Sequence, residues 1–268
     1  MKKFHTRYRA GRVLGMLAFA AASLAGCASS ETGNSQRPTV TVQLALVGGD
    51  ATQDGALEFK DADGLPLTVT SARAVVTALD FRLPDALVCG PDGQTSGGYA
   101  CEVGEGRIKV EGPWFVDLIS GEWDPPLETI SLPDGTYERV EVEFDDAHDG
   151  LVPDTDPLVG NSLVAEGTLP LSGTPQGFQL RVDFSEEARF EGQFVLGPGA
   201  MEQPISLALD ASTWFSGLPI TQCAEDDEFL LEGGTLVLSE GGGACSDLEG
   251  QVKEAIRGGG SLDEVEEP

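Results

Sequence analysis

The chain has 268 residues, of which 40% are hydrophobic and 7% aromatic, and its 45 acidic and 16 basic side chains give a net charge of −29. This composition indicates a folded domain with an acidic surface and excludes a mainly disordered chain. The 35 glycines and 16 prolines favour short strands joined by turns over long helices.

Residues 1–26 predict an export signal, because they contain five basic side chains and no acid. Their uncharged run over residues 13–26 suits a signal peptide but is shorter than the roughly 20 residues of a transmembrane helix. The run ends in Leu24-Ala25-Gly26-Cys27, which resembles the lipobox of bacterial lipoproteins. The resemblance implies cleavage before Cys27 and acylation of its thiol. An ordinary secretory signal with an incidental cysteine is the alternative.

The exported part is more acidic than the whole chain. Without residues 1–26 it keeps 11 basic and 45 acidic side chains, a net charge of −34. Such a field repels nucleic-acid phosphates and anionic lipids, so we expect no nucleic-acid partner. Attachment to the bilayer would therefore rest on the acyl chains of Cys27. Ala28 follows in place of an acid, which by a sorting rule of some Gram-negative lipoproteins implies the outer membrane, with the leaflet left open.

Four more cysteines follow, and they are Cys89, Cys101, Cys223 and Cys245. An even number in an oxidising compartment predicts disulfides. Three pairings are possible, and local loop closure favours Cys89 with Cys101 and Cys223 with Cys245. A four-thiolate zinc site is the alternative, but these spacings lack the close cysteine pairs of zinc ribbons.

The chain after the signal predicts a flexible, lipidated tether over residues 27–38 and a β-sandwich domain over residues 39–222. Hydrophobic side chains recur at every second position in the first strand, which places Val40, Val42, Leu44 and Leu46 on one face. A long strand with a bend midway follows, with Val75, Thr77, Leu79 and Phe81 on one side.

Further strands follow at short spacing up to PISLALDA, and Leu132-Pro133-Asp134-Gly135 predicts a hairpin turn between ISL and TYERVEVEF. Eight or nine strands without intervening helices predict a mainly β fold, an antiparallel β-sandwich with a short C-terminal helix. Trp214 and Phe215 follow the strand PISLALDA. They either plug the open end of the sandwich or form an apolar contact surface for a glycan or protein.

Residues 223–260 predict a disulfide-pinned hairpin and helix. Leu248, Val252 and Ile256 recur at helical spacing, and Ser246-Asp247-Leu248-Glu249 fits a capping box. Gly258 is expected to close the helix. Residues 261–268 predict a disordered acidic tail.

A family resemblance adds to this reading. The motifs Val69-Thr70-Ser71-Ala72, Trp114 to Leu118 (W-x-x-D-L) and Leu132 to Tyr137 (L-P-x-G-x-Y) resemble an uncharacterised bacterial surface-lipoprotein family. The resemblance covers residues 39–210 and implies a transthyretin-like or immunoglobulin-like β-sandwich at the cell surface. It implies no reaction. The sequence departs from the family at Gly48-Gly49-Asp50-Ala51, where a D-A-P turn is common.

Catalytic patterns are scarce. His148 is the only histidine after the signal, and no G-x-S-x-G motif is present. A Ser-His-Asp triad using His148 stays open, although this residue is expected to be solvated among acids. Calcium is a weak alternative to no cofactor at all, because one loop carries several carboxylates, the ligands that Ca²⁺ prefers. These candidate ligands are Asp145, Asp146, Asp149, Asp154 and Asp156.

The sequence therefore predicts a membrane-anchored bacterial envelope lipoprotein. Its domain is expected to be a non-enzymatic binding or structural module that contacts an envelope protein or glycan. The alternative is an envelope hydrolase that cleaves a glycan or peptide with paired carboxylates.

Overall fold

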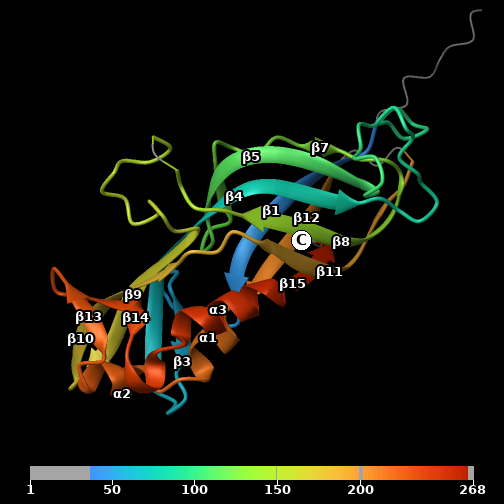
Figure 1. Cartoon of the computed structure of the whole chain (residues 1–268). Coiled ribbons are helices and arrows are strands. Elements are labelled where there is room, and N and C mark those ends of the chain that lie inside the picture. The colour runs from blue at the N-terminus through green and yellow to red at the C-terminus, as the bar shows by residue number, and fades with distance from the viewer. Residues whose placement is uncertain (1–36, 149, 199–201, 265–268) are drawn as a thin grey trace, which may run out of the picture. The chain divides into compact units, whose positions relative to one another are not determined.

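The computed structural model describes residues 37–148, 150–198 and 202–264, all within one unit, Ser35–Pro268. Strands hold 51% of the described residues and helices 11%, which confirms the mainly β class. The strands pair into one sheet that encloses a hydrophobic cluster, a sandwich-like arrangement (Figure 1). The strands are β1 Thr39–Val47, β2 Asp50–Ala51, β3 Leu57–Lys60, β4 Pro66–Arg82, β5 Arg107–Asp117, β6 Glu122–Asp124, β7 Ile130–Ser131, β8 Gly135–Phe144, β9 Leu163–Leu171, β10 Thr174–Val182, β11 Glu187–Leu196, β12 Gln203–Asp210, β13 Phe229–Glu232, β14 Thr235–Gly241 and β15 Gly260–Glu264.

Strand β4 holds the sheet together, because it pairs with four other strands. Its first half pairs with β3 and β9, and its second half pairs with β5 and β8. A register shift between Val76 and Ala78 interrupts both pairings of the second half. A bulge of this kind bends a strand and moves later side chains to new positions. It accounts for the bend that the sequence predicts, and it separates Val75 from the main cluster that contains Leu79 and Phe81.

The sheet is mixed, so the prediction of a purely antiparallel sandwich is wrong. Strands β1 and β12 run parallel over their whole length, with Leu44 opposite Leu207. Strand β10 pairs parallel with β14, and β11 pairs parallel with β15. The alternation of hydrophobic side chains gives the buried face but is the same for both strand directions. The alternation therefore predicts that β1 has one buried face, and this is confirmed. It does not predict which strand lies beside β1.

The predicted hairpin at Leu132-Pro133-Asp134-Gly135 is also wrong. Strand β7 before the turn pairs with β1, whereas β8 after it pairs with β4 and β11. The motif instead orders the entry into β8. The hydroxyl of the buried Tyr137 donates a hydrogen bond to the carbonyl of Pro133 (2.9 Å), and its ring stacks on Phe194. The L-P-x-G-x-Y motif thus has a packing function.

Four short helical segments cover one part of the sheet, namely α1 Ser212–Ser216, α2 Ile220–Glu225, the 3₁₀ turn η1 Gly243–Cys245 and α3 Leu248–Arg257. The first two were not expected from the sequence. Trp214 and Phe215 in α1 are fully buried, which supports the plug and not the contact surface. The predicted helix α3 is confirmed with Leu248, Val252 and Ile256 buried. The capping box is not formed, because no side chain caps the helix and Ser246 donates to the Gly243 carbonyl.

The chain from Gly260 to Glu264 forms strand β15, so the predicted disorder of the acidic tail is wrong for these residues. Strand β15 lies between β11 and β12 and pairs with both. The insertion needs close approach of backbones: a Cβ at Gly192 would lie 2.0 Å from the Leu262 carbonyl oxygen. Only a glycine fits there without displacing β15. Residues 265–268 lie outside the described residues.

Candidate functional site

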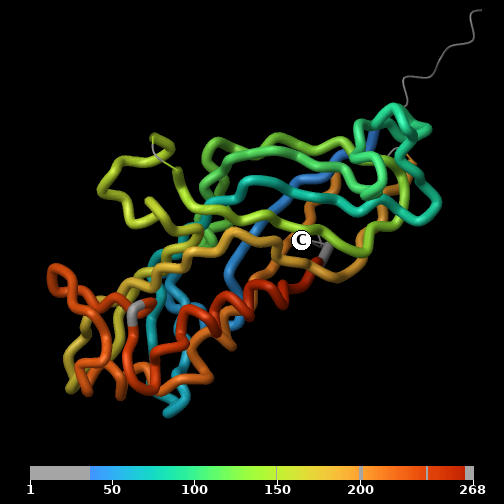
Figure 2. Tube along the Cα trace, in the orientation of Figure 1, coloured from blue at the N-terminus to red at the C-terminus, as the bar shows by residue number. Residues whose placement is uncertain are grey.

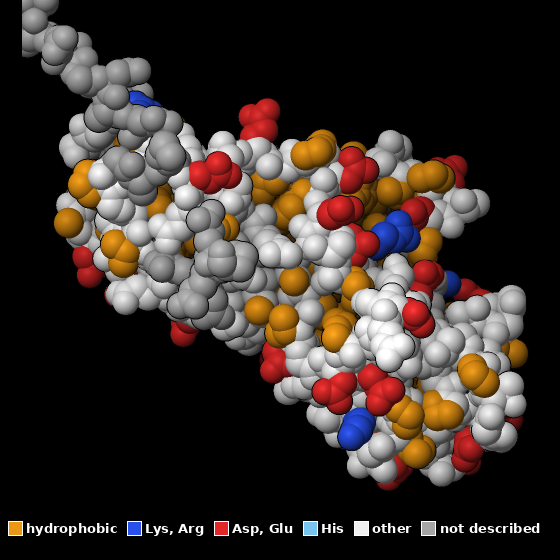
Figure 3. All heavy atoms as spheres, turned by 180° about the vertical axis from the view of Figure 1, so that it is seen from behind, with side chains coloured by type: hydrophobic (Ala, Val, Ile, Leu, Met, Phe, Trp, Pro, Cys, Tyr) orange, Lys and Arg blue, Asp and Glu red, His pale blue; other side chains and the backbone are white. Residues whose placement is uncertain are grey.

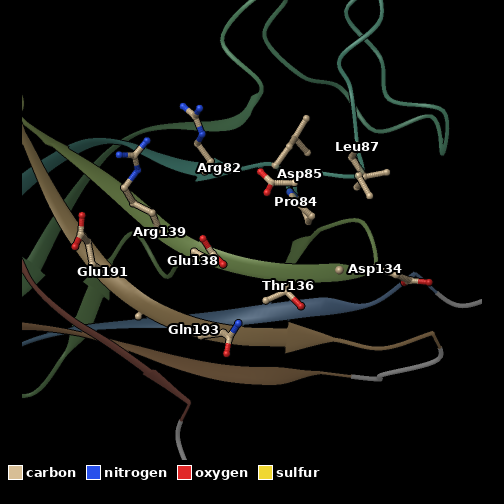
Figure 4. A pocket seen from close by; sticks show the side chains of 14 residues that line it. Arg82, Pro84, Asp85, Leu87, Asp134, Thr136, Glu138, Arg139, Glu191 and Gln193 are labelled. Atoms are coloured by element: carbon tan, nitrogen blue, oxygen red, sulfur yellow. The ribbon is translucent and has the colours of Figure 1, made fainter.

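A cleft of about 840 Å³ lies at one end of strands β4, β8 and β11. Its volume falls within the range of small-molecule sites, roughly 300–1,000 Å³. Arg82 from β4 and Arg139 from β8 extend on the same side of the sheet (Figure 4). The other lining residues are Leu83, Pro84, Asp85, Ala86, Leu87, Asp134, Gly135, Thr136, Glu138, Glu191, Gly192 and Gln193.

Backbone contacts fix the loop over residues 83–87, which forms one wall of the cleft. The amide of Leu83 donates to the Gly106 carbonyl, and the amide of Leu87 donates to the Pro84 carbonyl (2.8 Å), closing a turn. The proline ring packs on the start of β8, where a Cβ at Gly135 would lie 2.5 Å from its Cγ. The wall therefore depends on a glycine at the first residue of β8.

The disulfide-closed loop lies next to the cleft. The predicted pairing is confirmed: Cys89 bonds Cys101, and Cys223 bonds Cys245. A second hollow of about 440 Å³ between this loop and residues 37–38 shares Leu87 and Asp134 with the cleft. Within it the guanidinium of Arg37 lies 4.5 Å from the centre of the Tyr99 ring, a cation–π contact.

Charged side chains cover the outer face of β5, β4, β8 and β11 beside the cleft. Arg107 contacts four carboxylates: Glu102 at 2.6 Å, Glu105 at 2.8 Å, Asp80 at 3.1 Å and Glu187 at 3.3 Å. The ammonium of the neighbouring Lys109 binds Glu143 at 2.5 Å. The side chain of Asp80 is completely buried, and no described group donates a hydrogen bond to either of its oxygens.

Burial raises the pKa of Asp80 to about 6, against the opposing attraction of Arg107 and Lys109. One carboxylate oxygen each from Asp80, Glu143 and Glu187 lie within 4.8 Å of one another, a spacing that a metal ion could use. However, Arg107 already lies against Asp80 and Glu187, and Lys109 against Glu143. These side-chain cations occupy the place of a metal ion, so we interpret the cluster as an ion-pair network.

The loop over residues 145–162 leaves the end of β8 as a long excursion (Figure 2) and carries the predicted calcium ligands. Asp145 and Asp146 lie with His148, with one ligand atom of each within 4.8 Å of the others. Asp156 instead forms two hydrogen bonds of 3.1 Å with Arg73, and Asp154 is exposed. Asp149 lies outside the described residues. The loop therefore divides the predicted calcium ligands, and calcium stays the weaker alternative to the prediction of no cofactor.

Hydrogen bonds hold the carboxylates of Asp145 and Asp156 in their charged forms. Ser185 and the amide of Asp146 donate to Asp145 and lower its pKa. Burial opposes the ionisation of Asp156, but hydrogen bonds from Arg73 and the Leu158 amide outweigh it, and its pKa is lowered. Both residues thus have structural partners within the protein.

His148 does not form the central member of a triad in this arrangement. Its side chain is 69% exposed, which confirms that it is solvated. The hydroxyl of Ser185 lies 2.6 Å from Asp145, and the imidazole lies 3.8 Å from the other oxygen of Asp145. A triad needs the imidazole between the hydroxyl and the carboxylate, whereas here the carboxylate lies between them.

Sequence reasoning missed the two arginines of the cleft, because no motif marks Arg82 or Arg139. The available signal was the scarcity of basic residues: of the 11 after residue 26, five lie on four strands of this one face. These five are Arg82, Arg107, Lys109, Arg139 and Arg189.

Residues 1–36 lie outside the described residues, and with them the export signal, Cys27 and most of the tether. Within residues 37–148, 150–198 and 202–264, no helix has the length and apolar character needed to cross a bilayer.

Comparisons with known proteins give little beyond this geometry. No family model matches the chain, and no curated protein matches it. Among solved structures, MbnP from Methylosinus trichosporium is similar at 14% identity with a TM-score of 0.33, covering 67% of this chain and 78% of that one.

Proposed function

We propose that the chain is a lipoprotein of the bacterial cell envelope, held in the outer membrane by acylated Cys27. Its β domain binds a small molecule, or a segment of an envelope glycan or protein, and carries out no reaction. The resemblance of residues 24–27 to a lipobox and the resemblance of the strand motifs to a surface-lipoprotein family support the anchoring. Two disulfides support export, because such bonds persist in oxidising compartments.

The cleft at the end of β4, β8 and β11 is the observation that carries the binding part of this proposal. It combines a volume typical of ligand sites with many polar and charged side chains, among them Arg82 and Arg139, beside apolar ones such as Leu87, a lining that suits a polar or charged ligand. Strands β4 and β8 supply Arg82 and Arg139, so the backbone positions of both arginines are fixed before a ligand binds.

Mass spectrometry of the protein extracted from membranes tests the anchor. We expect a chain that begins at residue 27 and carries acyl chains on its first residue. Cys27→Ser is expected to leave the signal uncleaved or the product unacylated. If cells that express the wild-type gene release the protein unmodified into the soluble fraction, this would contradict the anchoring.

Calorimetric titration of the lipidated chain in nanodiscs tests the cleft. The probes are saccharide and peptide fragments released from purified envelopes. Gln193→Trp fills the cleft, whereas Thr174→Trp, on the exposed start of β10, is the matched control. We expect saturable binding that only Gln193→Trp removes. Equal binding by both variants would exclude the cleft, and cleavage of a fragment would favour the hydrolase alternative.

A further inference from the structure

Three arginines lie in a row across neighbouring strands. The register pairs Arg82 of β4 with Arg107 of β5, and its pairing of Phe81 with Val140 places Arg82 opposite Arg139 of β8. Like charges directly opposite on a sheet repel one another and destabilise it. Such a row is unexpected in a chain with 45 acidic and 16 basic side chains, which has ample carboxylates to alternate with the arginines.

The two outer arginines have carboxylate partners, and the central one has none among the described residues. Arg107 contacts four carboxylates, and Arg139 lies 3.4 Å from Glu141. Glu141 also contacts Arg189 at 3.3 Å, so its charge is shared. Among the residues that the structure describes, no carboxylate lies within 4.0 Å of the guanidinium of Arg82, which is exposed.

An exposed arginine without a carboxylate partner among the described residues is unusual in so acidic a chain. Acidic side chains far outnumber basic ones on the face of the molecule that Figure 3 shows from behind. Arg82 and Arg139 nevertheless both line the cleft and extend on the same side of the sheet (Figure 4). The guanidinium group presents a planar fork of N–H donors that matches the oxygens of a carboxylate or phosphate.

We propose that Arg82 and Arg139 form an oxyanion-binding subsite of the cleft, which takes the carboxylate, sulfate or phosphate group of a small ligand. An oxyanion there accepts hydrogen bonds from both forks and removes the repulsion between them. The rest of the cleft carries four acidic side chains, Asp85, Asp134, Glu138 and Glu191, of which Glu191 lies opposite Arg139 in the register of β8 and β11. These acids repel further negative charge, so the ligand has one oxyanionic group on an otherwise neutral or cationic body. This inference rests on the proposed function of the cleft and specifies its ligand.

Titration of the lipidated chain, labelled with ¹⁵N-arginine and held in phosphatidylcholine nanodiscs, tests the subsite. The probes are inorganic phosphate, sulfate and acetate at constant ionic strength, followed through the arginine Nε–Hε resonances. We expect saturable shifts of Arg82 and Arg139, weakened more than tenfold by Arg82→Gln. The control Arg181→Gln removes an arginine that pairs with Glu232 on a different part of the sheet, and leaves the shifts unchanged. Unshifted Arg82, or equal affinity in Arg82→Gln, would overturn the inference.

Two further titrations distinguish a failure of this inference from a failure of the proposed function. Glucuronate is expected to bind the cleft, and glucose, its neutral counterpart, at least tenfold more weakly. Equal binding of both would retain the cleft as a site and overturn the oxyanion subsite. Saturable phosphate shifts without binding of any envelope fragment would support the subsite and contradict the proposed function. Shifts that arise in phosphatidylglycerol nanodiscs without added phosphate would assign the oxyanion to lipid and overturn a small ligand.

Discussion

Arg107 Nη1 lies 3.1 Å from Oδ2 of Asp80, yet the carboxylate receives no hydrogen bond from any described group. The pair is therefore an ionic contact inside the protein, and burial of the carboxylate dominates over the attraction. Its pKa of about 6, against 3.8 for the free side chain, means that folding favours the protonated form. The stabilisation of the folded state that comes from protonated Asp80 is thus fully present below about pH 4.

We predict that this contribution is lost as the pH rises from about 4 to about 6, because the unfolded chain then binds fewer protons than the folded one. A shift from 3.8 to about 6 corresponds to about 3 kcal/mol. Asp80→Asn removes the ionisation. The difference in unfolding free energy between this variant and wild type, measured by urea denaturation, should rise in favour of the variant over that interval. A pH-independent difference would refute the assignment.

Asp61 connects two distant parts of the chain, and we predict that Asp61→Ala destabilises the fold by about 2–4 kcal/mol. Its buried carboxylate accepts hydrogen bonds from the amides of Asp63, Leu65 and Thr221 at 2.9–3.0 Å. Removal of the carboxylate leaves these amide donors without a partner, and each donor that stays buried destabilises the fold by about 1–3 kcal/mol. Asp63→Ala, in the same turn but exposed, should cost less than about 0.5 kcal/mol in the same urea experiment.

Trp214→Ala should cost about 3–5 kcal/mol of stability. The side chain is 1% exposed and packs with Phe215 beneath α3, whose Gln251 donates hydrogen bonds to the carbonyls of Thr213 and Trp214. Thermal unfolding followed by circular dichroism measures the loss. Unchanged stability together with lost ligand binding would instead favour the contact surface.

Calcium should leave the melting temperature unchanged. Arg73 neutralises Asp156, and Asp145 already accepts a hydrogen bond from Ser185, so the described part of the loop offers few free carboxylates. Ca²⁺ takes six to eight oxygen ligands. Melting the protein in millimolar calcium and after chelation checks this. A higher midpoint in calcium that Asp145→Asn removes would establish a calcium site.

Local patterns in the sequence were enough for some elements of the fold. The alternation in β1 gave its buried face, and the spacing of Leu248, Val252 and Ile256 gave the position of α3. The disulfides followed from proximity in the chain, because closing a short loop costs less entropy. In each case the information lies within about 20 residues of sequence.

Other features depend on partners that are distant in sequence. The parallel pairing of β1 with β12 joins residues more than 150 positions apart, and the short acidic segment of β15 becomes a strand only because β11 and β12 accept it on both sides. The arginine row was not predictable for the same reason. Arg82, Arg107 and Arg139 are neighbours only through strand register.

The position of β15 has a consequence for biogenesis. Strand β12 pairs on one side with β1 and on the other with β15, so residues 39–47 and 260–264 are needed together to complete the sheet. A chain that crosses a membrane from its N-terminus cannot close this sheet until the second segment has emerged. For the export that we propose, folding should therefore follow translocation, and the mutual repulsion of 45 acidic side chains should oppose premature collapse and aggregation during transit.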